Sequence, residues 1–165
     1  MAPKKILATF TAEWIEKTLA LKTWSDKKDK MTEIFTEADV PKLEKGSYID
    51  LVAVLKKFMG DSHIGVAQSA VKAIGALAKG LRESFSELAK ELYPLMLQRF
   101  KEKRLVEELH TALTSMMYCV SLNDILEPLQ AGLKDKSPVI KCQCAVFLEK
   151  ALHTTYIDVL EDIQS

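Results

Sequence analysis

The sequence predicts an all-α protein made of helical hairpins stacked in a row. Three observations support this prediction. Apolar residues recur at helical spacing along nearly the whole chain, and almost no stretch alternates with the period of a strand. Glycine and proline are rare, at six and five of 165 residues. A layout of helix end, short polar turn and new helix also repeats along the chain.

The apolar spacing defines each element in turn. Helices are expected near residues 10–21, 25–37, 47–59, 64–79, 84–100, 104–119, 123–133 and 138–153, and a ninth begins within 156–164. Ser47 before Asp50 and Ser84 before Glu87 are weak capping boxes. Pro138 lies just inside a helix start, where its missing N–H removes no hydrogen bond.

The repeat indicates how these helices are arranged. In three segments a branched apolar residue falls five positions after the polar turn begins; the pairs are Asp61 and Val66, Lys101 and Val106, and Asp135 and Ile140. The turns lie 40 residues (61 to 101) and 34 residues (101 to 135) apart, near the ~40-residue period of HEAT and armadillo arrays. With an earlier turn at Trp24, this predicts an α-solenoid of HEAT-type hairpins, about four repeats in a flat paddle.

We expect a single domain over residues 1–165. Its hairpins cover roughly 8–38, 47–80, 84–120 and 122–154, and 155–165 is the start of a further helix or a makeshift cap. Helix 138–153 is apolar nearly all round, which is wrong for a terminal repeat with a polar outer face. We therefore expect either an array that continues past Ser165 or a segment 156–164 that folds back as a makeshift cap. We also expect a monomer, with association possible through the uncapped C-terminal end.

Stacked hairpins predict two different edges. The turns inside the hairpins form one edge, here called the turn edge, and the loops 39–46, 80–84 and 121–124 form the other. The turn edge carries Lys22, Trp24, Lys27, Lys28, Asp61, Ser62, His63, Lys101, Lys103, Arg104, Lys134, Lys136 and Lys141. Such a charge run is either a solvated face or a binding surface. Trp24 is either a plug in a helix corner or a contact for a partner.

Composition and motifs argue against several function classes. The formal net charge is zero, and no apolar run approaches a membrane span, so we expect no nucleic-acid or membrane partner and a cytosolic location. Motifs for phosphate-binding loops, nucleophile elbows and HExxH metal sites are missing from the sequence. Cys142 and Cys144 have the wrong spacing for a zinc knuckle. We therefore predict no catalytic residue, metal or cofactor, and reduced cysteines that are mostly buried.

Several stretches resemble a known family. KTWSDKKDKM, from Lys22 to Met31, resembles the opening K-x-W-x-x-[RK]-x-x-x-[LM] pattern of tubulin-binding TOG domains. These are HEAT-type arrays that occur in tandem in microtubule polymerases. Residues 41–85, 93–117 (with the turn FKEK) and 133–144 (LKDKSPVIKCQC) are similar to the second TOG domain of the tandem array. The resemblance covers about residues 14–153.

This resemblance implies that the turn edge binds αβ-tubulin at microtubule ends, in the cytoplasm and on the microtubules, spindle or centrosome. The tubulin-binding residues that it implies are Trp24, Lys27, His63, Ile64, Lys101, Lys103, Lys136 and Lys141. One departure stands out, because TOG domains of this family usually have six hairpins and this chain has room for four. The chain is therefore either truncated or an unusually short relative, and in both cases the missing fifth turn predicts reduced affinity for tubulin.

Two alternatives remain from the residues themselves. A HEAT-type adaptor would bind another protein through its concave helical surface, and Trp24→Ala would then leave partner binding intact. A nucleic-acid scaffold would use the same lysines with a salt-dependent affinity. The zero net charge and the lack of stacking aromatics among the lysines disfavour it.

Overall fold

The computed structural model describes residues 2–164, with the side chains of residues 156–159 and 162 outside this description. Within these residues the chain forms eight α-helices: α1 (Ala12–Leu19), α2 (Trp24–Ala38), α3 (Ile49–Met59), α4 (Ile64–Leu81), α5 (Ser86–Gln98), α6 (Val106–Met116), α7 (Leu122–Leu133) and α8 (Pro138–Gln164). Short 3-10 helices cover Arg82–Phe85, Arg99–Lys101 and Lys103–Leu105.

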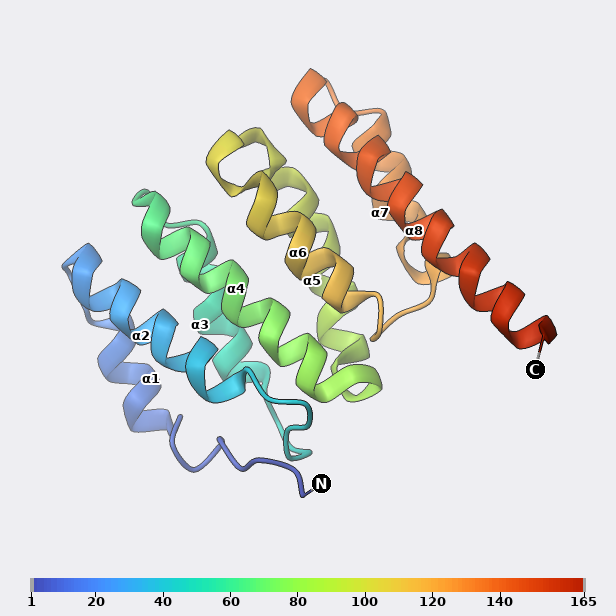
Figure 1. Ribbon diagram of the computed structural model, residues 1–165. Helices are drawn as coiled ribbons and strands as arrows, with labels where there is room; N and C mark the ends of the chain where they lie inside the picture. The colour runs from blue at the N-terminus through green and yellow to red at the C-terminus, as the bar shows by residue number, and fades with distance from the viewer. Residues whose placement is uncertain (1, 165) are drawn as a thin grey trace.

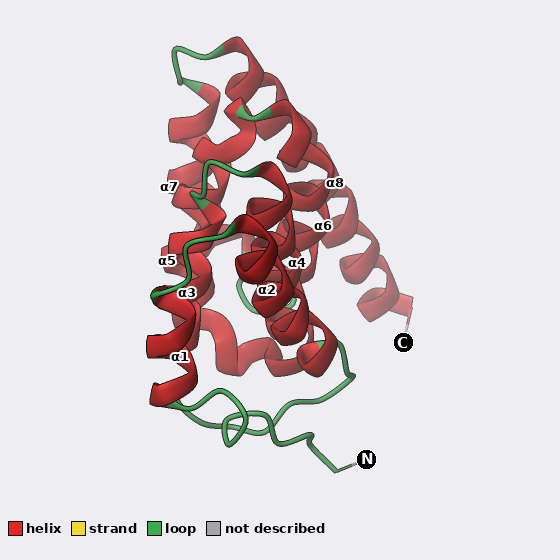
Figure 2. Ribbon diagram, turned by 90° about the vertical axis from the view of Figure 1, so that its left-hand side faces the viewer, coloured by secondary structure: helices red, strands yellow, loops and turns green. Residues whose placement is uncertain are grey.

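The helices stack in two layers. Helices α1, α3, α5 and α7 form one layer and α2, α4, α6 and α8 form the other, in chain order along the molecule (Figures 1 and 2). The four turns inside the hairpins lie along the upper edge in Figure 1, and the connecting loops lie along the lower edge. The predicted all-α solenoid is thus confirmed, as is the separation of its two edges.

Helix α4 is the centre of the core. It packs against α2, α3 and α6, and its side chains are buried on almost every side, which explains its all-round apolar sequence. A Cβ atom at Gly75 would lie 3.2 Å from the Cα atom of Ala112. The glycine therefore lets α4 and α6 approach backbone to backbone.

The predicted capping boxes at Ser47 and Ser84 are wrong. Tyr48 immediately precedes α3 without a side-chain cap, and Ser84 lies inside the 3-10 helix that leads into α5. The capping box that the structure does contain begins α7. There the Ser121 hydroxyl accepts from the Asp124 N–H, and the Asp124 carboxylate accepts from the Ser121 N–H at 2.9 Å.

The expected break before a ninth helix is also wrong, because α8 continues unbroken from Pro138, the predicted start, to Gln164. After Pro138 this stretch holds no proline or glycine. The hydroxyls of Thr154 and Thr155 donate to carbonyls one turn back, at 3.0 and 2.9 Å, so their hydrogen bonds lie within the helix. The last part of α8 extends past the stack and does not fold back as a cap (Figure 1).

A segment at the N-terminus contributes to the core, which the sequence reading did not predict. Residues 2–10 run along the lower edge of the first hairpins (Figure 1), and Lys4 forms an isolated β-bridge with Leu43. One carboxylate oxygen of Glu44 accepts from the N–H groups of Ile6 and Leu7, at 3.0 and 2.9 Å. The Ile6 side chain is fully buried. Long-range contacts therefore order a segment that has no helical periodicity.

The expectation of mostly buried cysteines holds for two of the three. Burial raises the pKa of the Cys119 thiol to about 12 and that of Cys144 to about 11. Cys142 is exposed, because residues two apart on a helix point in different directions. Cys144 faces α7, where Gly132 leaves room for its sulfur.

A buried histidine predicts an acid-sensitive fold. His110 packs between the rings of Phe100 and Phe147, at centroid distances of 4.9 and 6.4 Å. Its Nε2 lies 2.7 Å from the Gln143 side-chain oxygen, and its buried Nδ1 has no hydrogen-bond partner among the residues that the structure describes. Burial lowers its pKa below the ordinary 6.5, against the Gln143 hydrogen bond, and the charge of Lys150 lowers it further.

Because the pKa of His110 is lower in the folded chain, the unfolded chain takes up the proton first as the pH falls. The free energy of unfolding should therefore decrease below about pH 6.5. Denaturant titrations at pH 7.5 and 5.5 measure this change. His110→Phe removes the titrating group, and its free energy of unfolding should vary less over that range. An equal pH dependence in the two proteins would show that another group is responsible.

Candidate functional site: the turn edge

Trp24 lies at the first residue of α2, at one end of the turn edge. Its side chain is half exposed, at 51%. The indole stacks face to face on the imidazole of His63, with centroids 4.2 Å apart and ring planes 4° from parallel. His63 belongs to the next turn, before α4. Trp24 therefore does not plug a helix corner, because one ring face contacts the neighbouring turn and half of the side chain remains open to solvent.

His63 is held on both sides by its own turn. Its backbone N–H donates to the Asp61 carboxylate at 2.8 Å, and its Nδ1 accepts from the Gly65 N–H at 3.2 Å. The imidazole is thus the N-cap of α4. Because Nδ1 accepts, a neutral ring carries its proton on Nε2. The stacking partner of Trp24 consequently has a fixed position and a defined tautomer.

Asp61 also links the first two turns directly. The Lys27 ammonium donates to the Asp61 carboxylate at 3.1 Å, and side-chain exposures of 22% and 12% show that the pair is largely shielded. Burial alone would raise the pKa of Asp61, but hydrogen bonds from the His63 N–H and Lys27 keep it below its ordinary value. The Lys27 ammonium, a predicted tubulin contact, therefore already has a partner within the chain.

The third and fourth turns have acids in the same role as Asp61. The Glu102 carboxylate accepts from the Arg104 N–H at 3.1 Å and pairs with the same residue's guanidinium at 3.0 Å. These hydrogen bonds lower the pKa of Glu102 to about 2. Asp135 accepts from the Ser137 N–H at 2.9 Å, and this bond lowers the pKa of Asp135.

The sequence marked Asp61 and Asp135 as turn starts, but the structural role of these three acids was not predicted. Each carboxylate accepts from the backbone N–H two residues further on, which is the geometry of an Asx-type turn. The signal for that role is an acid near the start of each polar turn, two residues before the N–H group that it accepts from. The turn edge is therefore less basic than its lysines indicate, because each of these turns also contains a carboxylate.

Side-chain hydrogen bonds connect neighbouring turns along the whole edge. Lys27 joins the first turn to the second through Asp61. Gln68, on α4, donates to the Arg104 carbonyl of the third turn at 2.8 Å. Gln98, at the end of α5, donates to Asp135 of the fourth turn at 3.3 Å. The four turns are therefore fixed relative to one another by polar contacts as well as by helix packing.

The remaining predicted contact residues differ in exposure. Ile64 is partly buried and packs against the core. Lys101, Lys103, Lys136 and Lys141 are exposed. Among the residues that the structure describes, these four lysines form no ion pair. The structure thus places Trp24 and four unpaired lysines on one edge, in line with the prediction of a binding surface there.

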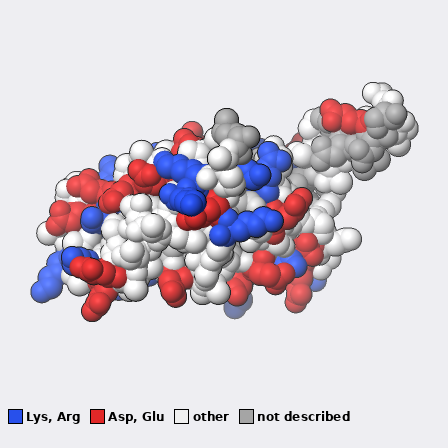
Figure 3. Space-filling model, turned by 90° about the horizontal axis from the view of Figure 1, so that it is seen from below, with Lys and Arg blue, Asp and Glu red and all other residues white. Residues whose placement is uncertain are grey.

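The opposite edge shows a different charge pattern. Lys and Arg are interspersed there with Asp and Glu, as Figure 3 shows from below. Several of these charges pair within the chain, for example Lys4 with Glu37 at 2.9 Å.

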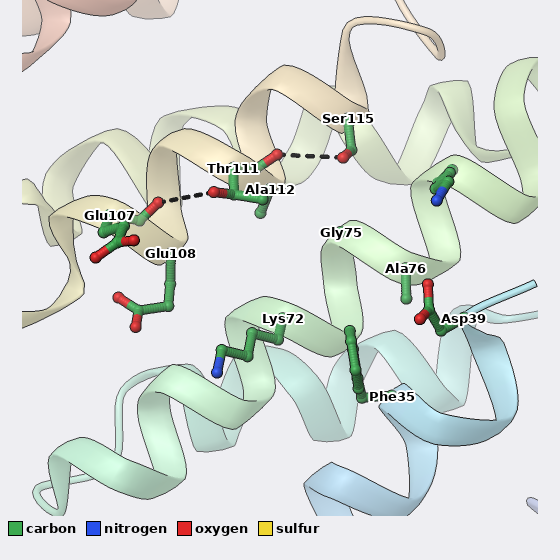
Figure 4. Close-up of a pocket in the computed structure, with 11 residues that line it drawn as sticks. Phe35, Asp39, Lys72, Gly75, Ala76, Glu107, Glu108, Thr111, Ala112 and Ser115 are labelled. Carbon is green, nitrogen blue, oxygen red and sulfur yellow. Dashed lines mark hydrogen bonds between the residues drawn. The ribbon is translucent and has the colours of Figure 1, made fainter.

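A groove between α2, α4 and α6 is the other candidate surface, and it is where a HEAT-type adaptor would bind. It encloses about 450 Å³ and is lined by Phe35, Asp39, Lys72, Gly75, Ala76, Lys79, Glu107, Glu108, Thr111, Ala112 and Ser115 (Figure 4). The Thr111 and Ser115 hydroxyls donate to carbonyls of their own helix, at 3.1 and 3.2 Å.

The described part of the chain lacks two other kinds of feature. No group of three or more His, Cys, Asp or Glu side chains there is placed to hold a metal ion. No described helix is long and apolar enough to cross a membrane.

Comparison with known proteins agrees with this geometry. No family model matches the sequence. The chain is 34% identical to the protein mini spindles of Drosophila melanogaster over 158 residues, 93% of this chain and 8% of that protein. It is 32% identical to centrosomal protein 224 of Dictyostelium discoideum over 94% of this chain and 8% of that protein. The chain thus spans under a tenth of the length of these relatives.

Solved structures show the same fold. A chain from a study of microtubule plus-end tracking by XMAP215, CLIP-170 and EB1 superimposes with a TM-score of 0.84 and 33% identity, over 91% of this chain and 64% of that one. A chain from work on tubulin recruitment by microtubule polymerases with tumor overexpressed gene (TOG) domain arrays gives a TM-score of 0.83 and 25% identity, over 92% of this chain and 32% of that one.

Fold and turn edge together define a HEAT-type α-solenoid with an exposed aromatic residue and unpaired lysines along one edge. The chain belongs to the TOG domains of the microtubule polymerase family. The family resemblance noted in the sequence is thereby confirmed.

Proposed function

We propose that this chain is a non-enzymatic module that binds αβ-tubulin through its turn edge and acts on microtubule dynamics. It would work at microtubule ends, in the cytoplasm and on the spindle or centrosome. The observation that carries the proposal is the half-exposed Trp24 beside four unpaired lysines, on a fold shared with TOG domains of microtubule polymerases.

The mechanism follows from the rigidity of the edge. The turns are held in line before binding, so little conformational entropy is lost when a partner docks. Trp24 offers a large apolar surface for burial in the interface. The lysines steer the chain toward an acidic partner, and salt weakens such long-range attraction. We therefore expect fast association at low ionic strength and a marked loss of affinity as salt is added.

Charge reversal at the turn edge should weaken binding specifically. Lys103→Glu combined with Lys136→Glu replaces two attractive charges by repulsive ones, and we expect tubulin affinity to fall by about tenfold or more at low salt. Lys72→Glu is the matched control, because Lys72 is exposed but lines the groove between α2, α4 and α6. Affinities come from fluorescence titration with labelled αβ-tubulin at two salt concentrations.

The same pair of variants tests the adaptor alternative. If Lys72→Glu weakens binding and the turn-edge variant does not, the groove rather than the turn edge is the binding surface. The proposal itself is tested by co-elution of the wild-type chain with unpolymerised αβ-tubulin in size-exclusion chromatography at low salt. A shared peak is expected, and separate peaks at concentrations well above micromolar would overturn the proposal.

A further inference from the structure

The stack of Trp24 on His63 raises the question of what the histidine does. The family resemblance implies that both residues contact tubulin. In the structure, however, one flat face of the imidazole is covered by the indole, with ring centroids 4.2 Å apart and planes 4° from parallel. Its Nδ1 is also occupied by the Gly65 N–H. One face and one nitrogen of the imidazole are therefore already in contact with other residues of the chain.

We infer that His63 is a positioning residue, which holds the Trp24 ring in the orientation in which it meets tubulin. This inference rests on the proposed function, and it assigns His63 a role that acts through Trp24. An exposed indole on a helix start would otherwise sample several rotamers. A stacked partner that is itself immobile selects one of them before binding, which lowers the entropy lost on association.

The supporting contacts form a bracket between the first two turns, made of Trp24, Lys27, Asp61 and His63. Asp61 accepts from the backbone of His63 and from the side chain of Lys27. Lys27 lies one helical turn after Trp24 on α2. The backbone around Trp24 and the ring that it stacks on are thus tied to the same carboxylate. No other turn of the described edge carries a stacked aromatic pair.

Gly65 lies directly beside the His63 ring of this bracket. A Cβ atom at this position would lie 3.2 Å from His63 Cε1 and 3.3 Å from Nδ1, with the Lys28 side chain at 3.6 Å. A Cβ atom there would press on the imidazole, which would have to shift by a few tenths of an ångström. The absence of a side chain leaves the space that the histidine needs to lie flat against Trp24.

Two substitutions separate the capping role of His63 from its stacking role. His63→Asn keeps a side-chain oxygen that can cap α4, but it removes the stacking surface. His63→Phe keeps a ring for stacking and removes the cap. The energy of an aromatic pair corresponds to about two- to tenfold in an equilibrium constant, and this limits what the stack can contribute to binding by positioning Trp24. We expect His63→Asn to weaken tubulin binding by that factor and His63→Phe to restore most of it.

A spectroscopic measurement tests the inference without tubulin. Trp14→Phe leaves Trp24 as the only tryptophan of the chain, so time-resolved fluorescence anisotropy then reports its motion alone. The indole of the otherwise unchanged chain should show little fast depolarisation. Adding His63→Asn should produce a clear fast component, and adding His63→Phe should not. An unchanged decay with His63→Asn would overturn the inference.

A double-mutant cycle decides whether His63 acts through Trp24 or touches tubulin itself. In a Trp24→Ala background, His63→Asn should change the affinity by less than about twofold, since nothing remains to be positioned. The same loss as in the wild-type background would contradict a positioning role. If the wild-type chain does not bind tubulin, the proposed function fails. The anisotropy decay alone then shows whether His63 restricts the motion of the Trp24 ring.

Discussion

Trp24→Ala should reduce the affinity for αβ-tubulin by at least about 2 kcal/mol, which is roughly thirtyfold in the dissociation constant. Large aromatic residues that become buried in an interface produce losses of this size, and half of this side chain is open to solvent in the free chain. The free energy of unfolding should change much less, because the ring packs against the neighbouring turn rather than in the core. Fluorescence titration and denaturant unfolding measure the two quantities.

Tyr118→Ala is the matched control for this prediction. Tyr118 is also an exposed aromatic residue, at 65%, but it follows α6 on the opposite edge, where it lies beneath the Arg82 guanidinium at 5.8 Å. Its removal should leave tubulin affinity unchanged. Equal losses for the two variants, or none for Trp24→Ala, would show that the aromatic residue of the turn edge is not the anchor.

Phe147→Ala should have the largest effect on stability, about 3–5 kcal/mol in the free energy of unfolding. The ring is fully buried on α8 and lies 6.1 Å from Tyr93, whose hydroxyl donates to the Leu113 carbonyl at 2.8 Å. Removal of the ring would leave a cavity where the last hairpin, α7 and α8, packs against the rest of the stack. Urea titration followed by circular dichroism gives the change.

Phe147→Leu keeps most of the volume and should cost less than about 1.5 kcal/mol. A similar small loss for Phe147→Ala would mean that α8 is held mainly by other contacts. In a solenoid each hairpin touches only its neighbours, so the alanine variant should also reduce amide protection in α7 and α8 before that of α4. Native-state hydrogen exchange resolves this order.

Local periodicity was sufficient to predict the hairpins, because each helix has one apolar face repeated every three to four residues. Periodicity did not predict the segments whose structure depends on residues far away along the chain. The N-terminal segment is ordered by the Glu44 carboxylate, 37 to 38 residues away along the chain. The start of α3 is likewise not set by Ser47, whose neighbour Tyr48 is buried and donates to the Glu44 carbonyl at 2.8 Å.

The site was predicted in outline for the same reason. Repeat spacing places the four turns on one edge, and the lysines and Trp24 follow from their positions in those turns. Which side chains are free could not be predicted, since pairing depends on contacts between turns. Lys27 reaches Asp61, 34 residues on, and Trp24 meets His63, in the next turn. These contacts give Lys27 and His63 partners within the chain, and their direct contact with tubulin stays a prediction.

The most direct test of the account is to find which face of the chain touches tubulin. A photoreactive amino acid would replace Ser62 on the turn edge, Thr111 in the groove or Lys45 on the opposite edge, all of which are exposed. After irradiation with αβ-tubulin, we expect a cross-link from position 62 and none from positions 111 or 45. A cross-link from position 111 without one from position 62 would contradict the account and place the partner in the groove between α2, α4 and α6.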